Sequence, residues 1–233
     1  KTLAASLDAD FKRIQFTPDL LPADITGLNI YNRKNEEFEY VEGPVMTNVL
    51  LADEINRAPP RTQSALLEAM EERQVTIDGK TRKLEDVFIV LATQNPIETS
   101  GTFALPEAQM DRFMMQLSLG FPDEEQEIGI LKRFAAEDPL MRLEPICTKS
   151  DILNMRNLSG NVYIHESLQK YIVQVVHATR EHDEIALGVS PRGSLALMKT
   201  SQVYAAMQGR DYVIPEDIKK LVIPVLAHRM ICY

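Results

Sequence analysis

The chain has 233 residues, of which 45% are hydrophobic and 25% charged, a composition typical of a globular protein with one large core or two modest ones. Its longest wholly apolar run, Val87–Ala92, is far shorter than the roughly 20 residues of a membrane span, and no targeting segment opens the chain, so we expect a cytoplasmic protein without a membrane span. A formal net charge of −9 argues against general binding to nucleic acid, which depends on clustered Lys and Arg, and favours protein and nucleotide partners.

The two cysteines, Cys147 and Cys232, lie far apart and form no C-x-x-C motif. This spacing indicates neither a zinc site nor a disulfide framework. We expect two buried thiols.

The first residues, Lys1 to Leu7, have the pattern of the tail of a helix, and Phe11–Phe16 then alternate as a strand does. Lys1-Thr2 is similar to the end of a G-x-x-x-x-G-K-T phosphate-binding loop. That loop opens a helix of several turns, however, and only about two turns fit before Phe11. We therefore expect Lys1 to lie inside the helix, with the loop upstream of the given sequence.

The most informative stretch is Val49-Leu-Leu-Ala-Asp53-Glu54, which follows a turn-rich segment and an expected hairpin or extended loop over residues 37–44. Its apolar run predicts a strand buried on both faces, which delivers two adjacent carboxylates to its carboxyl edge. Ligands bind at that edge in open α/β sheets. The pair suits phosphoryl transfer, with Asp53 in the shell of a Mg²⁺ ion and Glu54 activating a water molecule. On this evidence alone, a strand that runs into an acidic loop is an equally good interpretation.

The stretch after Glu54 alternates between helices and strands. The predicted elements are a helix over Arg61–Arg73, a hairpin centred on Asp78-Gly79, a buried strand over Val87–Ala92 that leads to Asn95, a short helix over Pro106–Arg112, and a third buried strand over Met114–Leu119. This alternation indicates a parallel sheet flanked by helices.

Beyond Phe121 the pattern becomes wholly helical, with Leu168, Ile172, Val175 and Val176 on the inward face of one predicted helix. We place a domain boundary near Phe121. The prediction is an α/β domain over residues 1–121 and an all-α domain over residues 122–233.

Five motifs in this order resemble those of the AAA+ ATPases, and within them the MoxR family. They are Leu50-Leu-Ala-Asp-Glu-Ile-Asn-Arg-Ala-Pro-Pro60, Gln63-Ser-Ala-Leu-Leu-Glu-Ala-Met70, Ala92-Thr-Gln-Asn-Pro96, Leu105-Pro-Glu-Ala-Gln-Met-Asp-Arg-Phe113 and Gly188-Val-Ser-Pro-Arg192. The resemblance covers essentially the whole chain. It implies a P-loop NTPase sheet flanked by helices and followed by an α-helical lid domain.

The resemblance also implies roles for individual residues. Asp53 and Glu54 match the Walker B acids, and Asn95 matches the sensor that helps to position the attacking water. Arg112 matches the arginine finger that reaches the neighbouring subunit's nucleotide. Arg192 matches the second sensor, which reaches the nucleotide from the lid. Residues 38–44 and 75–84 correspond to the helix-two insertion and the pre-sensor hairpin.

Each of three residues also has a plainer interpretation. Asn95 before Pro96 fits a simple turn, and Arg112 fits a local partner of Asp111. Arg192 could be a surface residue at a Ser-Pro helix start, although an arginine is unfavourable at the positive end of a helix dipole. That misfit favours a phosphate or carboxylate partner for Arg192.

One departure from the family pattern is serious, because these 233 residues contain no Walker A loop. We interpret the chain as amino-terminally truncated and expect ATP binding of the full-length protein.

The resemblance implies an ATPase that uses ATP and Mg²⁺ to remodel, mature or assemble partner proteins, as a chaperone does. It implies a homo-oligomeric, hexameric ring and protein substrates or adaptors, among them von Willebrand factor A domain proteins. Two alternatives stay open. One is a motor subunit of a chelatase-like or nucleic-acid-translocating complex, which salt-sensitive DNA binding would favour. The other is a nucleotide-gated scaffold with little hydrolysis, against which Glu54, Asn95 and Arg112 argue.

Overall fold

The computed structural model describes residues 1–94, 101–134 and 139–233. Contacts between Cα atoms divide the chain into two compact units. The first unit contains Lys1–Leu105 and Pro122–Ile152, and the second contains Pro106–Phe121 and Leu153–Tyr233. The domain boundary near Phe121 stays a prediction.

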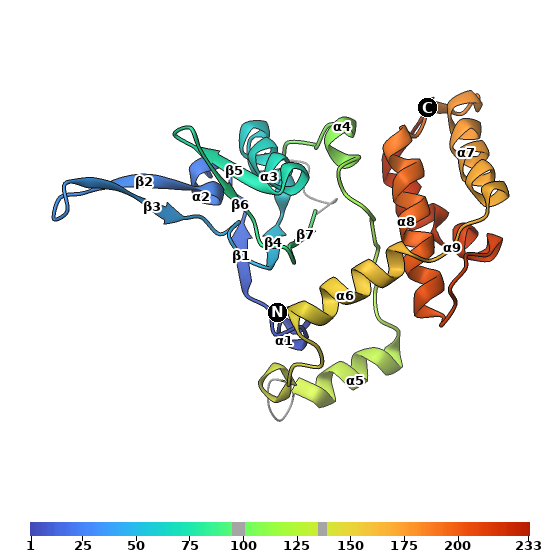
Figure 1. Cartoon of the computed structure of the whole chain (residues 1–233), viewed down its shortest axis with the longest axis horizontal. Helices are drawn as coiled ribbons and strands as arrows, with labels where there is room; N and C mark the ends of the chain where they lie inside the picture. Colours follow the sequence, from blue (N-terminus) through green and yellow to red (C-terminus); the bar gives the residue numbers. More distant parts are fainter. Residues whose placement is uncertain (95–100, 135–138) are drawn as a thin grey trace. The chain divides into compact units, whose positions relative to one another are not determined.

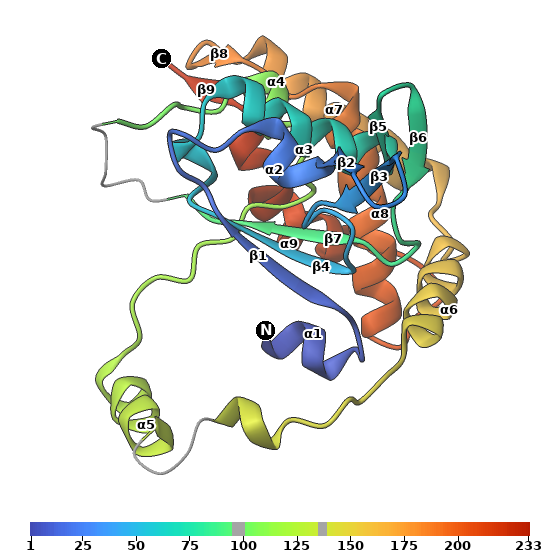
Figure 2. The same cartoon turned by 90° about the vertical axis from the view of Figure 1, so that its left-hand side faces the viewer.

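A parallel sheet of three strands forms the centre of the first unit, in the order β1 (Phe11–Gln15), β4 (Val49–Asp53) and β7 (Ile89–Ala92). Figure 2 shows the three strands side by side. Gln15 is paired with Asp53 at the carboxyl end, and Ala52 with Ala92. The carboxyl ends of all three strands therefore meet at one edge of the sheet.

The central strand β4 is buried as its apolar run predicts, since Val49, Leu50 and Ala52 are inaccessible to solvent. The prediction for β7 is only partly right. Ile89 and Leu91, which point to the same face of the strand, are each 40% exposed, whereas Val90 and Ala92 are partly buried.

The first unit also contains one long helix and several short helical segments. The long helix α3 (Pro60–Glu72) begins with proline at its first position, and α2 (Pro22–Thr26) packs against it (Figure 2). Leu66 and Leu67 of α3 are fully buried. The remaining helical segments of the first unit are α1 (Thr2–Ser6), η1 (Ile55–Arg57), α5 (Glu124–Phe134), η2 (Pro139–Arg142) and the start of α6 (Lys149–Gly160).

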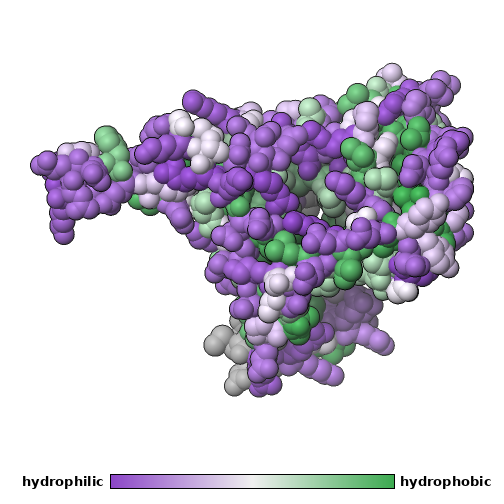
Figure 3. Space-filling model, viewed as in Figure 1, coloured by the Kyte–Doolittle hydropathy of each residue, from purple (hydrophilic) through white to green (hydrophobic). Residues whose placement is uncertain are grey.

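Two antiparallel hairpins complete the first unit. The longer pairs β2 (Gly27–Asn32) with β3 (Glu37–Glu42) and extends away from the sheet as an arm (Figure 1). Figure 3 shows the arm's surface as largely hydrophilic with scattered hydrophobic residues. The shorter pairs β5 (Gln74–Ile77) with β6 (Lys80–Lys83) around Asp78 and Gly79, both with positive φ, as the Asp-Gly pattern predicts.

The second unit is mostly helical, with α4 (Glu107–Met110), α7 (Glu166–Glu181), α8 (Pro191–Met207), α9 (Pro215–Leu226) and η3 (Ala227–Arg229). Its core contains Ile172 and Val176, and Leu168 and Val175 pack against it, as their helical spacing predicts. The expectation of pure helix is wrong in one place. A small antiparallel pair, β8 (Ile185–Leu187) and β9 (Ile231–Cys232), joins two distant segments.

The structure has no strand over Met114–Leu119, where we predicted a buried one. Leu119 is 98% exposed. A strand needs a neighbour for its backbone groups, and this segment has no strand partner within the described ranges. Instead the Gln116 N–H donates to the Pro224 carbonyl oxygen of α9, at 2.8 Å.

Both cysteines are free thiols. The expectation of burial is wrong for Cys232, which is exposed on the short strand β9, and Cys147 is only partly buried. Within the ranges that the structure describes, every helix is too short or too polar to cross a membrane.

Candidate active site

Asp53 is the last residue of β4, and groups from both neighbouring strands hold its carboxylate. Its Oδ1 accepts a hydrogen bond from Thr93 Oγ1 at 2.6 Å, just beyond the end of β7. Its Oδ2 accepts from Arg13 Nη2 at 2.5 Å and from Arg13 Nε at 3.1 Å. The Thr93 hydroxyl, followed by the Arg13 guanidinium, lowers the pKa of Asp53 below its ordinary value, although partial burial opposes the shift. Asp53 is therefore a carboxylate at neutral pH.

Glu54 follows Asp53 in a different environment. Its backbone is left-handed, with φ 54° and ψ 51°, a conformation that few residues other than glycine adopt. Its Oε2 accepts from Gln15 Nε2 at 2.7 Å and from Arg57 Nη1 at 3.0 Å. Its backbone N–H donates to Thr93 Oγ1 at 2.9 Å. Arg13 Nη2 also donates to Gln15 Oε1 at 2.8 Å. The sharp turn thus gives two adjacent carboxylates different direct partners within one hydrogen-bond network at the sheet edge.

Sequence reasoning missed Arg57, which follows Glu54 by three positions, and three residues from the neighbouring strands: Arg13, Gln15 and Thr93. The roles of these three depend on which strands are neighbours, and the sequence does not give the strand order. A weak signal exists in β1, where Arg13 and Gln15 alternate with the buried Ile14. This alternation puts two polar side chains on one face of the strand beside β4.

Of the predicted site residues, Asn95 lies outside the described residues. The described residues stop at Gln94, two positions beyond the end of β7, and continue from Gly101. The role of Asn95 stays a prediction.

The two predicted arginines both belong to the second unit. Arg112 lies just beyond α4, where its backbone N–H donates to the Gln109 carbonyl oxygen at 3.2 Å. Arg192 lies in the first turn of α8, and its backbone N–H donates to the side chain of the N-cap residue Ser190 at 3.1 Å. Arg192 Nη1 lies 3.8 Å from Oδ2 of Asp111, the residue before Arg112. The structure therefore brings Asp53 and Glu54 together in the first unit, and the region of Arg112 together with Arg192 in the second.

The first cluster suits a magnesium ion with a nucleotide. An ionised carboxylate at a strand end is the oxygen ligand that Mg²⁺ prefers, and Mg²⁺ sites of nucleotide enzymes use one or two carboxylates, waters and substrate phosphates. Among the described residues, no group of three or more His, Cys, Asp or Glu is placed to enclose a metal ion. Asp53 supplies one such carboxylate at the sheet edge.

Comparison with known proteins agrees with this arrangement. The ATPase family associated with various cellular activities (AAA) matches residues 1–115, and the AAA lid domain matches residues 177–233. The uncharacterized protein YeaC of Bacillus subtilis is 54% identical over 233 residues, which are all of this chain and 73% of YeaC. The chaperone MoxR1 of Mycobacterium tuberculosis is 44% identical over 240 residues, covering 99% of this chain and 63% of MoxR1.

A crystal structure of a candidate ATPase from Cytophaga hutchinsonii is 46% identical and superposes with a TM-score of 0.92. It covers all of this chain, which spans 73% of that protein. The parallel sheet, the strand ending in two acids and the helical second unit occur in the order that the family motifs predict. The chain belongs to the MoxR family of AAA ATPases.

Proposed function

We propose that the protein binds and hydrolyses ATP with Mg²⁺ and uses the energy to remodel, mature or assemble partner proteins. The observation that carries the proposal is the pair of carboxylates at the carboxyl end of β4. Thr93 and Arg13 donate to the Asp53 carboxylate, whereas Gln15 and Arg57 donate to the Glu54 carboxylate. Two neighbouring acids in different environments can take different roles in one reaction.

The roles follow from the environments. Asp53, whose pKa is lowered, is the ligand for the metal ion. Bound Mg²⁺ would neutralise the negative charge on the transferred phosphoryl group. Glu54 is the general base that accepts a proton from the attacking water, and Gln15 and Arg57 orient its carboxylate. Asn95 helps to position that water.

Magnesium dependence tests this proposal in the full-length protein, including any residues ahead of Lys1. Chelation of Mg²⁺ should abolish ATP hydrolysis, and Asp53→Asn should lower kcat/KM by about a hundredfold or more, the scale of a lost charge-stabilising group. Asp183→Asn makes the same charge change at an exposed turn of the second unit and should have no effect. Hydrolysis by Asp53→Asn at the parent rate would contradict the proposal.

We also propose that the active site is shared in a homo-oligomeric, hexameric ring. Arg112 then acts as a finger on the neighbouring subunit's nucleotide, and Arg192 acts as the second sensor that reaches a nucleotide from the lid. Contacts that repeat head to tail and close give such a ring. A mixture of inactive Arg112→Ala and Glu54→Gln subunits should recover ATP hydrolysis, because normal acids in one subunit meet a normal finger in the next. Mixed rings without activity would contradict the sharing.

The proposed partners are protein substrates or adaptors, von Willebrand factor A domain proteins among them, and the proposed location is cytoplasmic. The name of MoxR1, a chaperone, supports this class of substrate. Because hydrolysis releases a substrate in this scheme, Glu54→Gln with ATP should hold a purified partner in a stable complex. A complex of equal stability with and without ATP would contradict an ATP-driven cycle.

A further inference from the structure

The side-chain amide of Gln63 joins helix α3 to the turn that follows Glu54. Gln63 is fully buried, and its Nε2 donates hydrogen bonds to the carbonyl oxygens of Ile55 at 3.2 Å and Ala58 at 3.0 Å. Ile55 is the first residue of η1, and Ala58 directly follows its last residue. One buried amide therefore holds both ends of this short helical turn.

The same nitrogen joins η1 to the chain segment at Phe103. Gln63 Nε2 donates to the Phe103 carbonyl oxygen at 3.1 Å, and the Phe103 N–H donates to the carbonyl oxygen of Asn56, in the middle of η1, at 2.6 Å. The amide has two N–H groups, so its three acceptors share them. The turn is thus bonded both by the side chain from α3 and by the backbone at Phe103.

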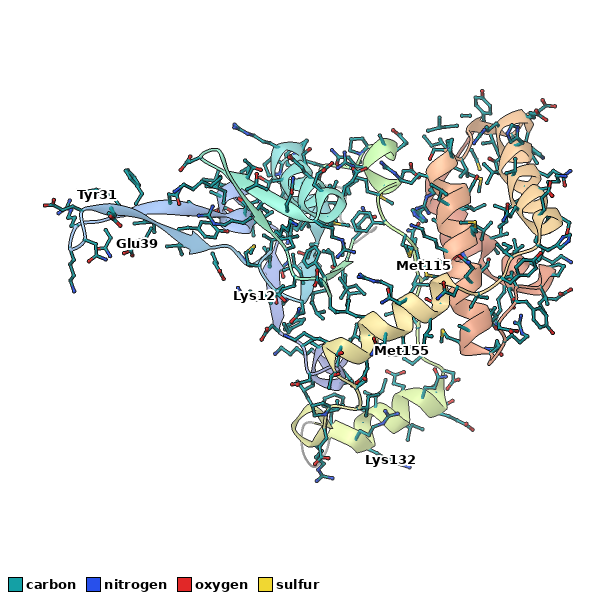
Figure 4. All side chains as sticks on the ribbon, in the orientation of Figure 1. Lys12, Tyr31, Glu39, Met115, Lys132 and Met155 are labelled. Atoms are coloured by element: carbon teal, nitrogen blue, oxygen red, sulfur yellow. The ribbon has the colours of Figure 1, made fainter. Side chains whose placement is uncertain are left out.

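The position of η1 determines where the Glu54 carboxylate lies. Glu54 directly precedes η1 in the left-handed conformation, and its carbonyl oxygen accepts from the Arg57 N–H at 2.9 Å. Arg57, the last residue of η1, also donates from Nη1 to Glu54 Oε2 at 3.0 Å. A shift of η1 would therefore move both the backbone that carries the carboxylate and a side chain that holds it. Figure 4 draws the side chains of the first unit, with Lys12 labelled on β1 beside β4.

An amide is not the side chain that core packing alone favours at position 63. Its Oε1 is buried and has no hydrogen-bond partner among the described residues. A buried acceptor without a partner lowers stability. What the amide contributes is the set of donated bonds that fix η1. Such precision matters at a reacting group, because a displacement of about 1 Å can lower a rate by about a hundredfold.

We propose that Gln63 is a positioning residue for Glu54. Its amide fixes η1, and η1 keeps the Glu54 carboxylate and its partner Arg57 in place at the sheet edge. This inference rests on the proposed function, in which Glu54 is the general base. Because Gln63 is fully buried, it acts on the chemical step through Glu54 and not by contact with the nucleotide.

Gln63→Met in the full-length protein, including any residues ahead of Lys1, tests the proposal. Methionine has a similar length and shape but cannot donate to the three carbonyl oxygens. The value of kcat should fall by at least about tenfold while the affinity for ATP stays within about twofold of the parent, because only the chemical step depends on the position of the base. Phosphate release measures kcat, and titration with a fluorescent nucleotide measures the affinity.

Gln63→Asn replaces this variant if Gln63→Met does not fold. Asparagine keeps the amide, but its side chain is shorter by one methylene group and cannot reach all three acceptors. Its kcat should fall by at least about threefold, again without loss of affinity for ATP.

Thr62, the preceding residue of α3, provides a matched control. It is 1% exposed, and its Oγ1 donates to the Leu20 carbonyl oxygen at 2.7 Å. Thr62→Val therefore also removes a buried donor from α3, but one that holds a segment other than η1. It should lower the melting temperature and leave kcat within about twofold of the parent.

The double variant of Gln63→Met with Glu54→Gln separates positioning from general loosening of the fold. If Gln63 acts through Glu54, its effect on kcat disappears once residue 54 can no longer take a proton. The double variant should therefore hydrolyse ATP within about twofold of the residual rate of Glu54→Gln. General loosening would instead lower that residual rate by about a further tenfold.

The outcomes distinguish this inference from the proposed function. Hydrolysis by Glu54→Gln at the parent rate would overturn the general base and, with it, the positioning role. If Glu54→Gln is slow and Gln63→Met keeps the parent kcat, the general base stands and only the positioning role is overturned. Equal falls of kcat in Gln63→Met and Thr62→Val, or a further fall in the double variant, would also overturn the positioning role alone.

Discussion

Thr93 connects the ends of two strands through a single hydroxyl group. The hydroxyl donates to Asp53 Oδ1 at 2.6 Å and accepts from the Glu54 backbone N–H at 2.9 Å. The backbone of Thr93 adds two more bonds, from its N–H to Ala52 and from the Ile55 N–H to its carbonyl oxygen, both at 3.0 Å. One residue therefore fixes the position of both acids relative to β7.

We predict that Thr93→Val weakens the affinity of the full-length protein for Mg²⁺ and ATP by about fivefold, which corresponds to about 1 kcal/mol. Valine keeps the shape and the backbone bonds but cannot donate to Asp53. The free energy of unfolding should change by less than about 1 kcal/mol, because the contact is exposed. Titration with a fluorescent nucleotide measures the affinity.

Thr93→Ser is the control for this prediction, since serine keeps the hydroxyl and should retain the affinity of the parent. Equal affinities for the valine and serine variants would show that the hydroxyl does not position Asp53 for the metal ion.

At the scale of elements, the arm formed by β2 and β3 is closely packed at its base, where its two strands join the rest of the first unit. Gly27 has φ 89° and ψ 175°, a region open almost only to glycine. A Cβ atom there would overlap the Val41 carbonyl oxygen and lie 2.6 Å from the Gly43 nitrogen. Farther along the arm, the Arg82 guanidinium lies 3.8 Å from the centroid of the Tyr40 ring, and Asn29 Nδ2 donates to Asp78 Oδ2 at 2.6 Å.

We predict that Gly27→Ala lowers the free energy of unfolding by at least about 2 kcal/mol, because it adds a backbone overlap to an unfavourable φ. Gly79→Ala is the control. Gly79 also has a positive φ, of 76°, but a Cβ there would meet nothing within 4 Å. It should cost only about 1 kcal/mol, and urea unfolding measures both. Equal losses would mean that the close approach at Gly27 is relieved by a small shift.

The elements differ in how well the sequence predicts them. The strand ending in Asp53, the helix that starts at Pro60 and the hairpin at Asp78-Gly79 each have a complete local signal, and the structure contains all three. The prediction of a hairpin or extended loop over residues 37–44 is wrong about the hairpin, because residues 37–42 form the single strand β3, and its partner β2 follows a turn-rich segment with no clear strand pattern. The strand over Met114–Leu119 was wrong, because a strand depends on a neighbour that its own residues do not specify.

The same distinction holds for the candidate site. Asp53 and Glu54 could be found because both stand at the end of one strand, within two consecutive positions. Thr93 and Arg13 could not, because they come from other strands and their relevance depends on the strand order. The contact of Gln63 with Phe103 spans 40 positions of the sequence, so no local pattern could reveal it.

At the scale of the whole molecule, two units carry different parts of one proposed reaction. The first carries the acids and the second carries the two arginines. Such a division gives nucleotide binding and hydrolysis separate structural requirements, so that a single substitution can remove one and leave the other. Glu54 is the residue at which this separation should be clearest, since its proposed role lies in the chemical step alone.

The central claim is that Glu54 activates water for ATP hydrolysis, and Glu54→Gln in the full-length protein tests it most directly. Glutamine keeps the size and one acceptor oxygen but cannot take a proton, so kcat should fall by about a hundredfold or more while the affinity for ATP stays within about twofold of the parent. Glu68→Gln, the same change on the exposed face of α3, should alter neither quantity. Both values are obtained from the same preparation by nucleotide titration and by phosphate release. ATP hydrolysis by Glu54→Gln at the parent rate, with intact binding, would contradict the account.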